Sequence, residues 1–342
     1  MHKIAIIGAT GIVGTTFLKV LEEYKIKADY SLFASHRSAG KVVNFMGKDY
    51  TILETTAENL AKAKPDFALL AAGGSTSIEF APILSGLGCT VIDNSSAFRR
   101  DPAVPLCVPE CNPEEVTSLR GTKQSLSGQK GCIISNPNCS TIGCVVALKP
   151  LDDLYHIKRV IYSTYQAVSG AGQAGVDDFL HGLDSYVKGK QPLPQKLQHP
   201  IFNNLIPHID VFLDNGNTKE EDKMIFETRK ILKRPDLAVS ATTVRVPIQN
   251  CHSVSINVEF ERKPCIATIK KVLAKAPGIV LLDNPAKNSY PMPIHANDRN
   301  EVFVGRIRLD ESRENCINLF TCSDNIRKGA ATNAIQILKL LL

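Results

Sequence analysis

The stretch of sequence that decides the fold is the first one, Lys3-Ile4-Ala5-Ile6-Ile7-Gly8-Ala9-Thr10-Gly11-Ile12-Val13-Gly14. Its apolar run predicts a strand over Lys3–Ile7, and the spacing of apolar residues beyond it predicts a helix over Ile12–Tyr24. Glycines at such a turn let the backbone approach an anion, and the helix offers its first N–H groups. The stretch therefore predicts a phosphate-binding turn of a dinucleotide fold, with a tight connection that binds nothing as the alternative.

The residues that follow alternate between strand and helix patterns as far as Ser135. Alternation of this kind predicts a doubly wound, Rossmann-like parallel sheet of the α/β class. The predicted strands are Tyr30–Ala34, Asp66–Ala72, Cys89–Asp93 and Gly131–Ser135, with a helix over Ile78–Leu87.

The pattern changes in the second half of the chain. Apolar residues at Val254, Ile256, Val258 and Phe260 alternate with polar ones, which is typical of a sheet with one covered face. We expect a second, α+β domain on a mostly antiparallel sheet. Its other predicted strands are Ala238–Pro247, Val302–Leu309 and Asn315–Thr321; its predicted helices are Val176–Lys188, Asp222–Leu232 and Ala267–Ala276, and a last helix spans Ile326–Leu342.

Length and composition limit the class of protein. The 342 residues correspond to about two domains. A hydrophobic content of 44% excludes a disordered chain, and the sequence lacks the ~18-residue apolar run of a spanning helix. The net charge of +6 fits an anionic small substrate, but no basic stripe indicates a nucleic-acid partner. Since no signal-peptide pattern is found, we expect a cytoplasmic protein.

The ten cysteines are scattered, and no Cys-x-x-Cys pair occurs. A disulfide framework belongs to short secreted chains, and the spacing matches no metal-binding pattern, so no metal site is expected. Most of these cysteines are predicted to be small buried residues.

The end of the second predicted strand reads Ser35-His36-Arg37-Ser38. An NAD-binding fold usually carries an acidic residue there for the ribose 2′-hydroxyl. Two hydroxyls and a guanidinium suit a 2′-phosphate instead. The segment therefore favours NADP over NAD, with a solvated Arg37 as the alternative.

The most informative stretch is Asn136-Pro137-Asn138-Cys139, which follows a predicted strand and precedes a helix. Asn138 is a suitable helix cap, so Cys139 falls in the first helical turn. There the helix dipole favours a thiolate, and backbone N–H groups can donate to an oxyanion. Cys144 lies deeper in the same helix and gains neither effect.

A thiol nucleophile beside a nicotinamide site implies aldehyde chemistry through a covalent thioester. Such a route needs a proton carrier, and histidine is the usual choice. Among eight histidines we select His252, because it begins a predicted strand and can share a pocket with Arg245. A surface or structural histidine is the alternative.

Taken together, these segments resemble the aspartate-semialdehyde dehydrogenase family, over nearly the whole chain. The segments that carry the resemblance are Gly8–Gly14, Ala34–Lys41, Ala72–Ser75, Asp93–Arg99, Val108–Glu110, Ser135–Thr141, Tyr165–Gly172, Thr218–Met224, Arg245–His252, Val304–Arg308 and Asp324–Ala331.

The resemblance implies roles for particular residues. Cys139 would be acylated, Gln166 would orient the substrate, and His252 would be the acid/base. Arg245 and Glu220 would hold the carboxylate and ammonium of the amino acid. The phosphate would be bound by Arg99, Lys223 and Asn138, and the cofactor by Gly8, Thr10, Gly11, Ile12, Val13, Ser35, Arg37, Ser38, Gly73 and Asn325.

The resemblance also implies an activity and an organisation. The reaction would be reductive dephosphorylation of β-aspartyl phosphate by NADPH to aspartate β-semialdehyde, within the biosynthesis of lysine, threonine and methionine. Residues 1–138 and 323–342 would form the NADP-binding domain, and residues 139–322 the catalytic and dimerisation domain of a homodimer or homotetramer.

Two other classes of protein compete with this interpretation. A reductase of N-acetyl-glutamyl phosphate shares the chemistry, but it typically has Gly before the cysteine and Tyr after it, where this chain has Asn138 and Ser140. A nonenzymatic NADP sensor has no use for the reactive set, and a Cys–His hydrolase leaves the glycine turn unexplained. Whether Arg99 or Arg100 meets phosphate, and whether Cys251 lines the site, stays open.

Overall fold

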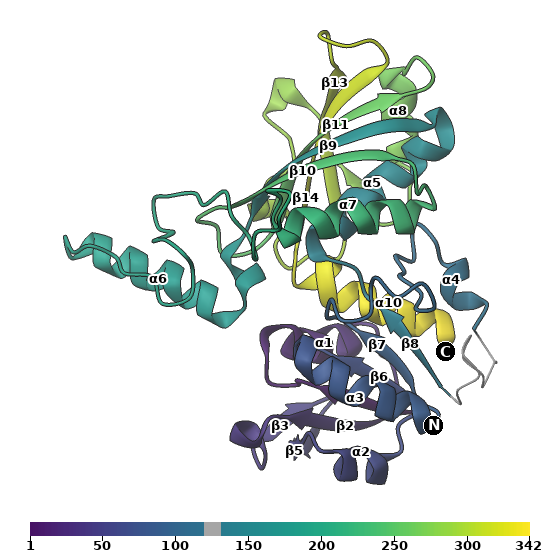
Figure 1. Ribbon diagram of the computed structural model, residues 1–342, viewed down its shortest axis with the longest axis vertical. Helices are drawn as coiled ribbons and strands as arrows, with labels where there is room; N and C mark the ends of the chain where they lie inside the picture. The colour runs from purple at the N-terminus through teal and green to yellow at the C-terminus, as the bar shows by residue number, and fades with distance from the viewer. Residues whose placement is uncertain (120–130) are drawn as a thin grey trace. The chain divides into compact units, whose positions relative to one another are not determined.

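The computed structural model describes residues 1–119 and 131–342 (Figure 1). These residues form two compact units, Met1–Pro137 with Ala330–Leu342, and Asn138–Gly329. Each unit is built on one six-stranded sheet. Residues 323–329, which the sequence-based division assigns to the cofactor domain, group with the second unit instead. There Asp324 accepts the N–H of Asp298 (2.8 Å) and Asn325 accepts that of Cys251 (2.8 Å).

The first unit has an all-parallel sheet in the order β5-β2-β1-β6-β7-β8. The order runs outward in both directions from the β1–β6 pair, so the doubly wound prediction is confirmed. The strands are β1 (Lys3–Ile7), β2 (Asp29–Ala34), β5 (Leu53–Glu54), β6 (Phe67–Leu70), β7 (Thr90–Asp93) and β8 (Cys132–Ser135).

Both faces of this sheet are covered, which explains the unbroken apolar run of β1. Ile4 and Ile6 pack into one core with α1 (Ile12–Glu23) and α10 (Thr332–Leu341), while Ala5 and Ile7 pack into a second core. Helices α2 (Ala57–Ala63) and α3 (Gly74–Gly86) supply the second core. The sequence did not predict the hairpin of β3 (Val42–Phe45) and β4 (Lys48–Thr51), α2, or the short α4 (Glu114–Thr117).

The second unit has a mixed sheet in the order β10-β9-β11-β14-β13-β12. The β9–β11, β11–β14 and β13–β14 pairs are antiparallel, whereas β9–β10 and β12–β13 are parallel. The strands are β9 (Ile157–Gln166), β10 (Ala238–Arg245), β11 (His252–Phe260), β12 (Ile279–Leu281), β13 (Val302–Leu309) and β14 (Cys316–Ser323).

Strand β9 was absent from the sequence prediction, although it lies between β10 and β11. Its buried positions include Thr164 and Gln166, so the apolar alternation fades toward its carboxyl end. Polar residues stand on the covered face there because that end lies at the candidate site described below.

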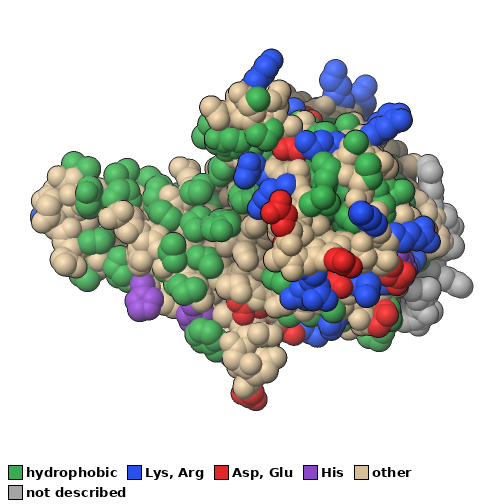
Figure 2. All heavy atoms as spheres, turned by 90° about the horizontal axis from the view of Figure 1, so that it is seen from above, with side chains coloured by type: hydrophobic (Ala, Val, Ile, Leu, Met, Phe, Trp, Pro, Cys, Tyr) green, Lys and Arg blue, Asp and Glu red, His purple; other side chains and the backbone are tan. Residues whose placement is uncertain are grey.

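The longer helices that pack against the sheet of the second unit are α5 (Cys139–Tyr155), α7 (Lys219–Leu232) and α8 (Ile266–Leu273). Helix α5 contacts β9, β11, β13 and β14. Helix α6 (Gln173–Val187) extends away from this sheet (Figure 1). Apolar side chains gather over this extension (Figure 2), where Leu180, Leu183, Tyr186 and Val187 are exposed. The remaining short helices of this unit are α9 (Pro293–Ala296), η2 (Val168–Ala171), η3 (Pro285–Lys287) and the π-helical η4 (Arg327–Ala331), which extends to the start of the next segment of the first unit. Another short helix, η1 (His36–Ser38), belongs to the first unit.

Within residues 1–119 and 131–342, no helix is both long enough and apolar enough to cross a membrane.

Candidate active site

The start of helix α5 is fixed by a side-chain cap. The side-chain oxygen of Asn138 accepts the N–H groups of Ser140 (3.0 Å) and Thr141 (3.2 Å), so Cys139 is the first helical residue. This geometry is the one that the sequence predicted for Asn138. The cap uses two first-turn N–H groups, so those of Ser140 and Thr141 are not available to an oxyanion.

The thiol of Cys139 faces the ring of His252. The sulfur of Cys139 lies 3.2 Å from Nε2 of His252. Cys139 is partly exposed, whereas His252 is buried. The other ring nitrogen, Nδ1, accepts the N–H of Ala167 (3.1 Å). In a neutral ring held this way the proton sits on Nε2, because Nδ1 is the acceptor. His252 therefore donates a hydrogen bond to the sulfur.

The neutral form of His252 is the favoured one. Burial holds the pKa of His252 well below its usual 6.5, and the positive charge of Arg245 lowers it further. An uncharged ring at neutral pH follows, which agrees with a backbone N–H pointing at Nδ1.

Arg245 lies at the carboxyl end of β10 and is 5% exposed. Its Nη1 donates to the carbonyl oxygen of Ala167 (2.7 Å), the residue whose N–H holds His252. Gly170 borders both side chains: a Cβ there would lie 2.8 Å from Nη1 of Arg245 and 3.1 Å from Cε1 of His252. The absence of a side chain at Gly170 thus leaves room for both groups.

A buried carboxylate, Glu220, joins the remaining polar residues. Its Oε1 accepts from the side-chain amides of Asn138 (3.0 Å) and Gln166 (3.4 Å), and its Oε2 pairs with Lys223 (3.3 Å). Lys223 also pairs with Asp210 (2.7 Å). Burial opposes the charge of Asp210, but the hydrogen bond and charge of Lys223 outweigh it and lower its pKa.

Six predicted residues thus meet in the second unit by direct contacts: Asn138, Cys139, Gln166, Glu220, Lys223 and His252, with Arg245 beside His252. Sequence reasoning missed Asp210, Gly170 and Glu227. Glu227 is 1% exposed and accepts the backbone N–H of Asn138 (2.6 Å). Its signal was available, since Glu227 follows Glu220 by two helical turns and so shares its face of α7.

Two cysteines that adjoin the site residues in sequence, Cys144 and Cys251, are buried. Cys251 packs with Ala296, Phe303 and Cys322, and its thiol donates to the carbonyl oxygen of Pro293 (3.6 Å). The hydrogen bond that the Cys251 thiol shares with Cys322, together with burial, raises the pKa of Cys251. Burial also raises the pKa of Cys144. Cys251 thus points into an apolar cluster.

In the first unit, the turn after β1 has the close contacts of a tight strand–helix junction. Gly8 has φ +86°, and a Cβ there would lie 2.8 Å from the backbone of Ala71. A Cβ on Gly14 would lie 2.0 Å from the carbonyl oxygen of Gly8. The N-cap of α1 is Gly11, which has no side chain to satisfy the first N–H groups of the helix. Such an N-terminus fits the phosphates of a dinucleotide.

The other predicted cofactor residues of this unit follow the two strands beside β1. Ser35, Arg37 and Ser38 follow β2, and Thr10 donates to Ser38 (3.3 Å) across the two turns. Gly73, with φ +92°, is the N-cap of α3 after β6. Because β2, β1 and β6 are parallel neighbours, these turns share the carboxyl edge of the sheet, where its order reverses. The residues therefore suit a dinucleotide.

Arg99 and Asn325 are the remaining predicted site residues. Arg99 belongs to the first unit, where its guanidinium donates to the carbonyl oxygen of Asn94 (3.0 Å). Asn325 belongs to the second, where it accepts the N–H of Cys251 (2.8 Å) and donates to Ser169 (3.0 Å). The side chain of Asn325 is thus used inside its own unit.

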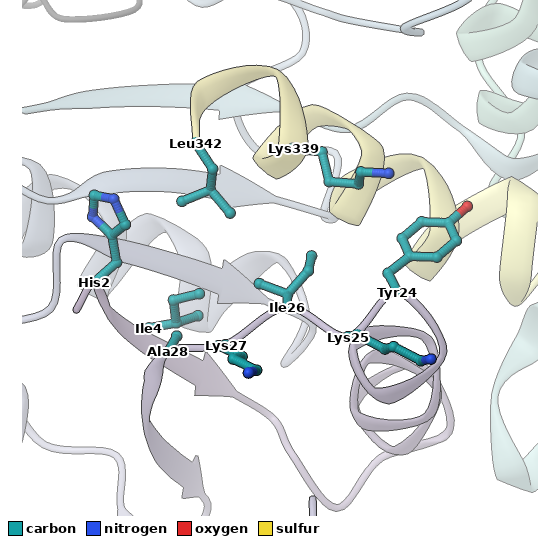
Figure 3. Close-up of a pocket in the computed structure, with 9 residues that line it drawn as sticks. All are labelled: His2, Ile4, Tyr24, Lys25, Ile26, Lys27, Ala28, Lys339 and Leu342. Carbon is teal, nitrogen blue, oxygen red and sulfur yellow. The ribbon is translucent and has the colours of Figure 1, made fainter.

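A separate pocket of about 320 Å³ lies at the opposite edge of the parallel sheet (Figure 3). It is lined by the start of β1, the segment between α1 and β2, and the end of α10. Since dinucleotides bind at the carboxyl edge, this pocket is not the one that the glycine turn serves.

Comparison with known proteins shows the family of the chain. Residues 3–119 match the family model of the semialdehyde dehydrogenase NAD binding domain, and residues 148–328 match that of the semialdehyde dehydrogenase dimerisation domain. The aspartate-semialdehyde dehydrogenase of Aquifex aeolicus is 52% identical over 343 residues, covering 100% of this chain and 98% of the relative. That of Campylobacter jejuni is 46% identical, covering 98% and 96%.

Solved structures give the same result. The crystal structure of aspartate semialdehyde dehydrogenase II from Vibrio cholerae, complexed with ASA, superposes with a TM-score of 0.93 at 40% identity, covering 100% of this chain and 98% of that one. The Candida albicans enzyme with NADP gives 0.76 at 28% identity, covering 100% and 98%. With its motifs, fold and relatives in agreement, the chain belongs to the aspartate-semialdehyde dehydrogenase family.

Proposed function

We propose that this protein is an aspartate-semialdehyde dehydrogenase that converts β-aspartyl phosphate to aspartate β-semialdehyde with NADPH, through a thioester on Cys139. One observation carries the proposal: a partly exposed thiol at the start of α5 lies 3.2 Å from a buried histidine. The curated relatives are aspartate-semialdehyde dehydrogenases, which disfavours the N-acetyl-glutamyl phosphate reductase.

The charges around the thiol complement an amino-acid substrate. Arg245 is a buried cation that would hold the α-carboxylate, and Glu220 is a buried anion that would hold the ammonium. Gln166 reaches the same oxygen of Glu220 as Asn138, so its amide would orient the substrate. An acetylated substrate has no ammonium, and Glu220 would then face it without a partner.

The covalent step requires a thiolate. Three features favour that form of Cys139: the start of α5, the Nε2–H of His252, and the charge of Arg245. The thiolate attacks the acyl carbon, the C–O bond to phosphate breaks, and the phosphate leaves with the electron pair. A thioester on Cys139 remains.

His252 acts first as a donor. Its Nε2–H would stabilise the attacking thiolate and the oxyanion of each tetrahedral intermediate. After reduction of the thioester, the oxyanion of the thiohemiacetal re-forms the carbonyl and expels the thiolate back onto the same N–H. Proton transfer by His252, the role that the family resemblance implies, then requires the ring to release the N–H of Ala167 from Nδ1.

The residues of the first unit fit NADPH, which supplies the hydride when bound. The glycine turn would hold its phosphates through Gly8, Thr10, Gly11, Ile12 and Val13, with Gly73 beside them. Ser35, Arg37 and Ser38 would take the 2′-phosphate, which favours NADP over NAD. The Candida albicans relative was solved with NADP. The family resemblance adds Asn325 to the same cofactor, which it would contact while its side chain also bonds Cys251 and Ser169.

The transferred phosphate would meet Arg99, Lys223 and Asn138. Lys223 is positioned for this by Asp210 and Glu220, which hold its ammonium from two sides. Phosphate is then released against fixed cations, which lowers the cost of its developing charge.

We further propose a cytoplasmic homodimer or homotetramer. Residues 148–328 match a dimerisation domain, and the exposed apolar side chains of α6 lie in that range. The first unit would hold the cofactor, and the second unit would carry the reacting residues and the contacts between subunits.

The reaction run in reverse tests the proposal. Protein, aspartate semialdehyde, NADP and phosphate are mixed, and NADPH is followed by its absorbance. We expect a phosphate-dependent signal that is weaker with NAD. Activity with N-acetylglutamate semialdehyde instead, without a signal from aspartate semialdehyde, would overturn the substrate assignment.

A further inference from the structure

The residue before the proposed nucleophile is held at three of its polar atoms. The side-chain oxygen of Asn138 caps α5, its side-chain amide donates to Glu220 (3.0 Å), and its backbone N–H donates to Glu227 (2.6 Å). Glu220 and Glu227 both lie on α7, seven residues apart, so one helix face holds both donors. We call Asn138, Glu220 and Glu227 the Asn138 clamp.

Burying the carboxylate of Glu227 costs folding free energy, which indicates that this carboxylate has a function. It is 1% exposed, and a carboxylate in such a place is destabilising unless it is strongly hydrogen-bonded. A charged acceptor makes a shorter and stronger bond than a neutral one, and the 2.6 Å contact to Asn138 fits this. That bond is made to the peptide N–H one residue before Cys139.

Gly329 packs closely against Cys139. A Cβ on Gly329 would lie 3.0 Å from Cβ of Cys139. Cys139 thus follows the anchored Asn138 and has Gly329 in close contact. A shift of Asn138 would change the 3.2 Å separation of the thiol from His252.

We propose that Glu227 is a positioning residue for the nucleophile: through the N–H of Asn138, its carboxylate fixes where the Cys139 thiol stands relative to His252. This inference rests on the proposed function, since it requires Cys139 to be the nucleophile. Glu220 and Asn138 are expected to touch the substrate, whereas the contact of Glu227 on which the inference depends is the one to the N–H of Asn138.

The test compares Glu227→Ala and Glu227→Gln with Glu221→Gln as a matched control. Glu221 is also buried on α7 and also accepts backbone N–H groups, but those of Thr218 (2.7 Å) and Thr243 (2.9 Å). Alkylation of Cys139 by iodoacetamide is measured against pH by peptide mass spectrometry. The exposed Cys265 is the internal reference in every sample.

We expect Glu227→Ala to lower kcat about 10- to 100-fold and to change the pH profile of Cys139 alkylation, while Cys265 reacts as before. The KM for NADP should stay within about twofold of wild type. Glu227→Gln keeps an acceptor oxygen, so its loss should be smaller, and it carries the test if the alanine variant does not fold. Glu221→Gln should lower the melting temperature but leave the ratio of Cys139 to Cys265 reactivity unchanged.

Two results would overturn the inference. One is a folded Glu227→Ala protein with wild-type kcat and Cys139 profile, and the other is an equal change of that profile in Glu221→Gln. The proposed function fails separately, if the wild type does not reduce NADP with aspartate semialdehyde or if Cys139→Ala remains active.

Discussion

Helices α1 and α5 each follow a strand of the parallel sheet in sequence, but their first turns are built in opposite ways. Helix α1 begins after Gly11, which offers no side chain, and Gly8 and Gly14 leave the backbone bare. Helix α5 begins after Asn138, whose side chain occupies the N–H groups of Ser140 and Thr141. We call the uncapped N-terminus of α1 the open start and the capped N-terminus of α5 the filled start. Free N–H groups at an open start suit an anion that binds and dissociates, whereas a filled start suits a nucleophile whose position is fixed.

The largest expected effect is at the filled start. Replacing Cys139 by Ala removes the nucleophile, so kcat should fall at least about a thousandfold. The turn at α1 is untouched, and the dissociation constant of NADPH, measured by fluorescence titration, should stay within about twofold. Turnover retained by a folded Cys139→Ala protein would show that α5 does not carry the chemistry.

Removing the cap of α5 should have the next largest effect. Asn138→Ala leaves the first turn without its cap, which costs about 1–2 kcal/mol of unfolding free energy, and we expect kcat to fall about a hundredfold. Asn138→Ser restores a cap but not the amide that Glu220 accepts. Chemical denaturation should therefore show stability regained by Ser while kcat stays low; equal recovery of both would reduce Asn138 to a structural residue.

The converse change gives α1 the cap that α5 has. In Gly11→Asn the new side chain competes with phosphate for the same N–H groups, so NADPH affinity should fall about tenfold, with unfolding free energy altered by only a few tenths of a kcal/mol. Gly86→Asn, at an exposed helix end with open space around it, is the control. If both variants bind NADPH like the wild type, the open start of α1 has no role in binding.

The smallest effect concerns pH. The folded pKa of His252 lies well below 6.5, so its neutral ring contributes stability above pH 6.5 that is lost as pH falls through the folded pKa. The acid limb of kcat/KM should likewise lie below 6.5 if it reports this ring. Exchange of His252 for Asn should flatten unfolding free energy against pH in that window. An unchanged slope would place the titrating group elsewhere.

The sequence alone predicted the open start of α1 better than it predicted the contacts that hold the filled start of α5. The glycine turn and the strands β1 and β2 are local sequence patterns. The predictions of β1, β2 and the doubly wound sheet were confirmed. Asn138 as a cap was also predicted, because capping is decided within four residues. Long-range partners were not, since Glu227, Asp210 and Gly170 act through contacts made across the fold.

The same limit explains two other differences. Strand β9 escaped prediction because Thr164 and Gln166 interrupt its apolar face at the site. His252 was selected as an acid/base from its place in the strand, but its tautomer depends on the N–H of Ala167, a residue 85 positions away. Local chemistry identifies the reacting groups, and tertiary contacts decide how each of them is protonated and held.

Trapping the acyl-enzyme tests most directly whether Cys139 carries the thioester. Protein is incubated with aspartate semialdehyde and NADP without phosphate, quenched in acid, digested and examined by mass spectrometry. We expect the peptide containing Cys139 to gain the mass of one aspartyl group and to lose it when phosphate is supplied before the quench. An unmodified Cys139 peptide under conditions where NADPH is formed would contradict a thioester at the start of α5.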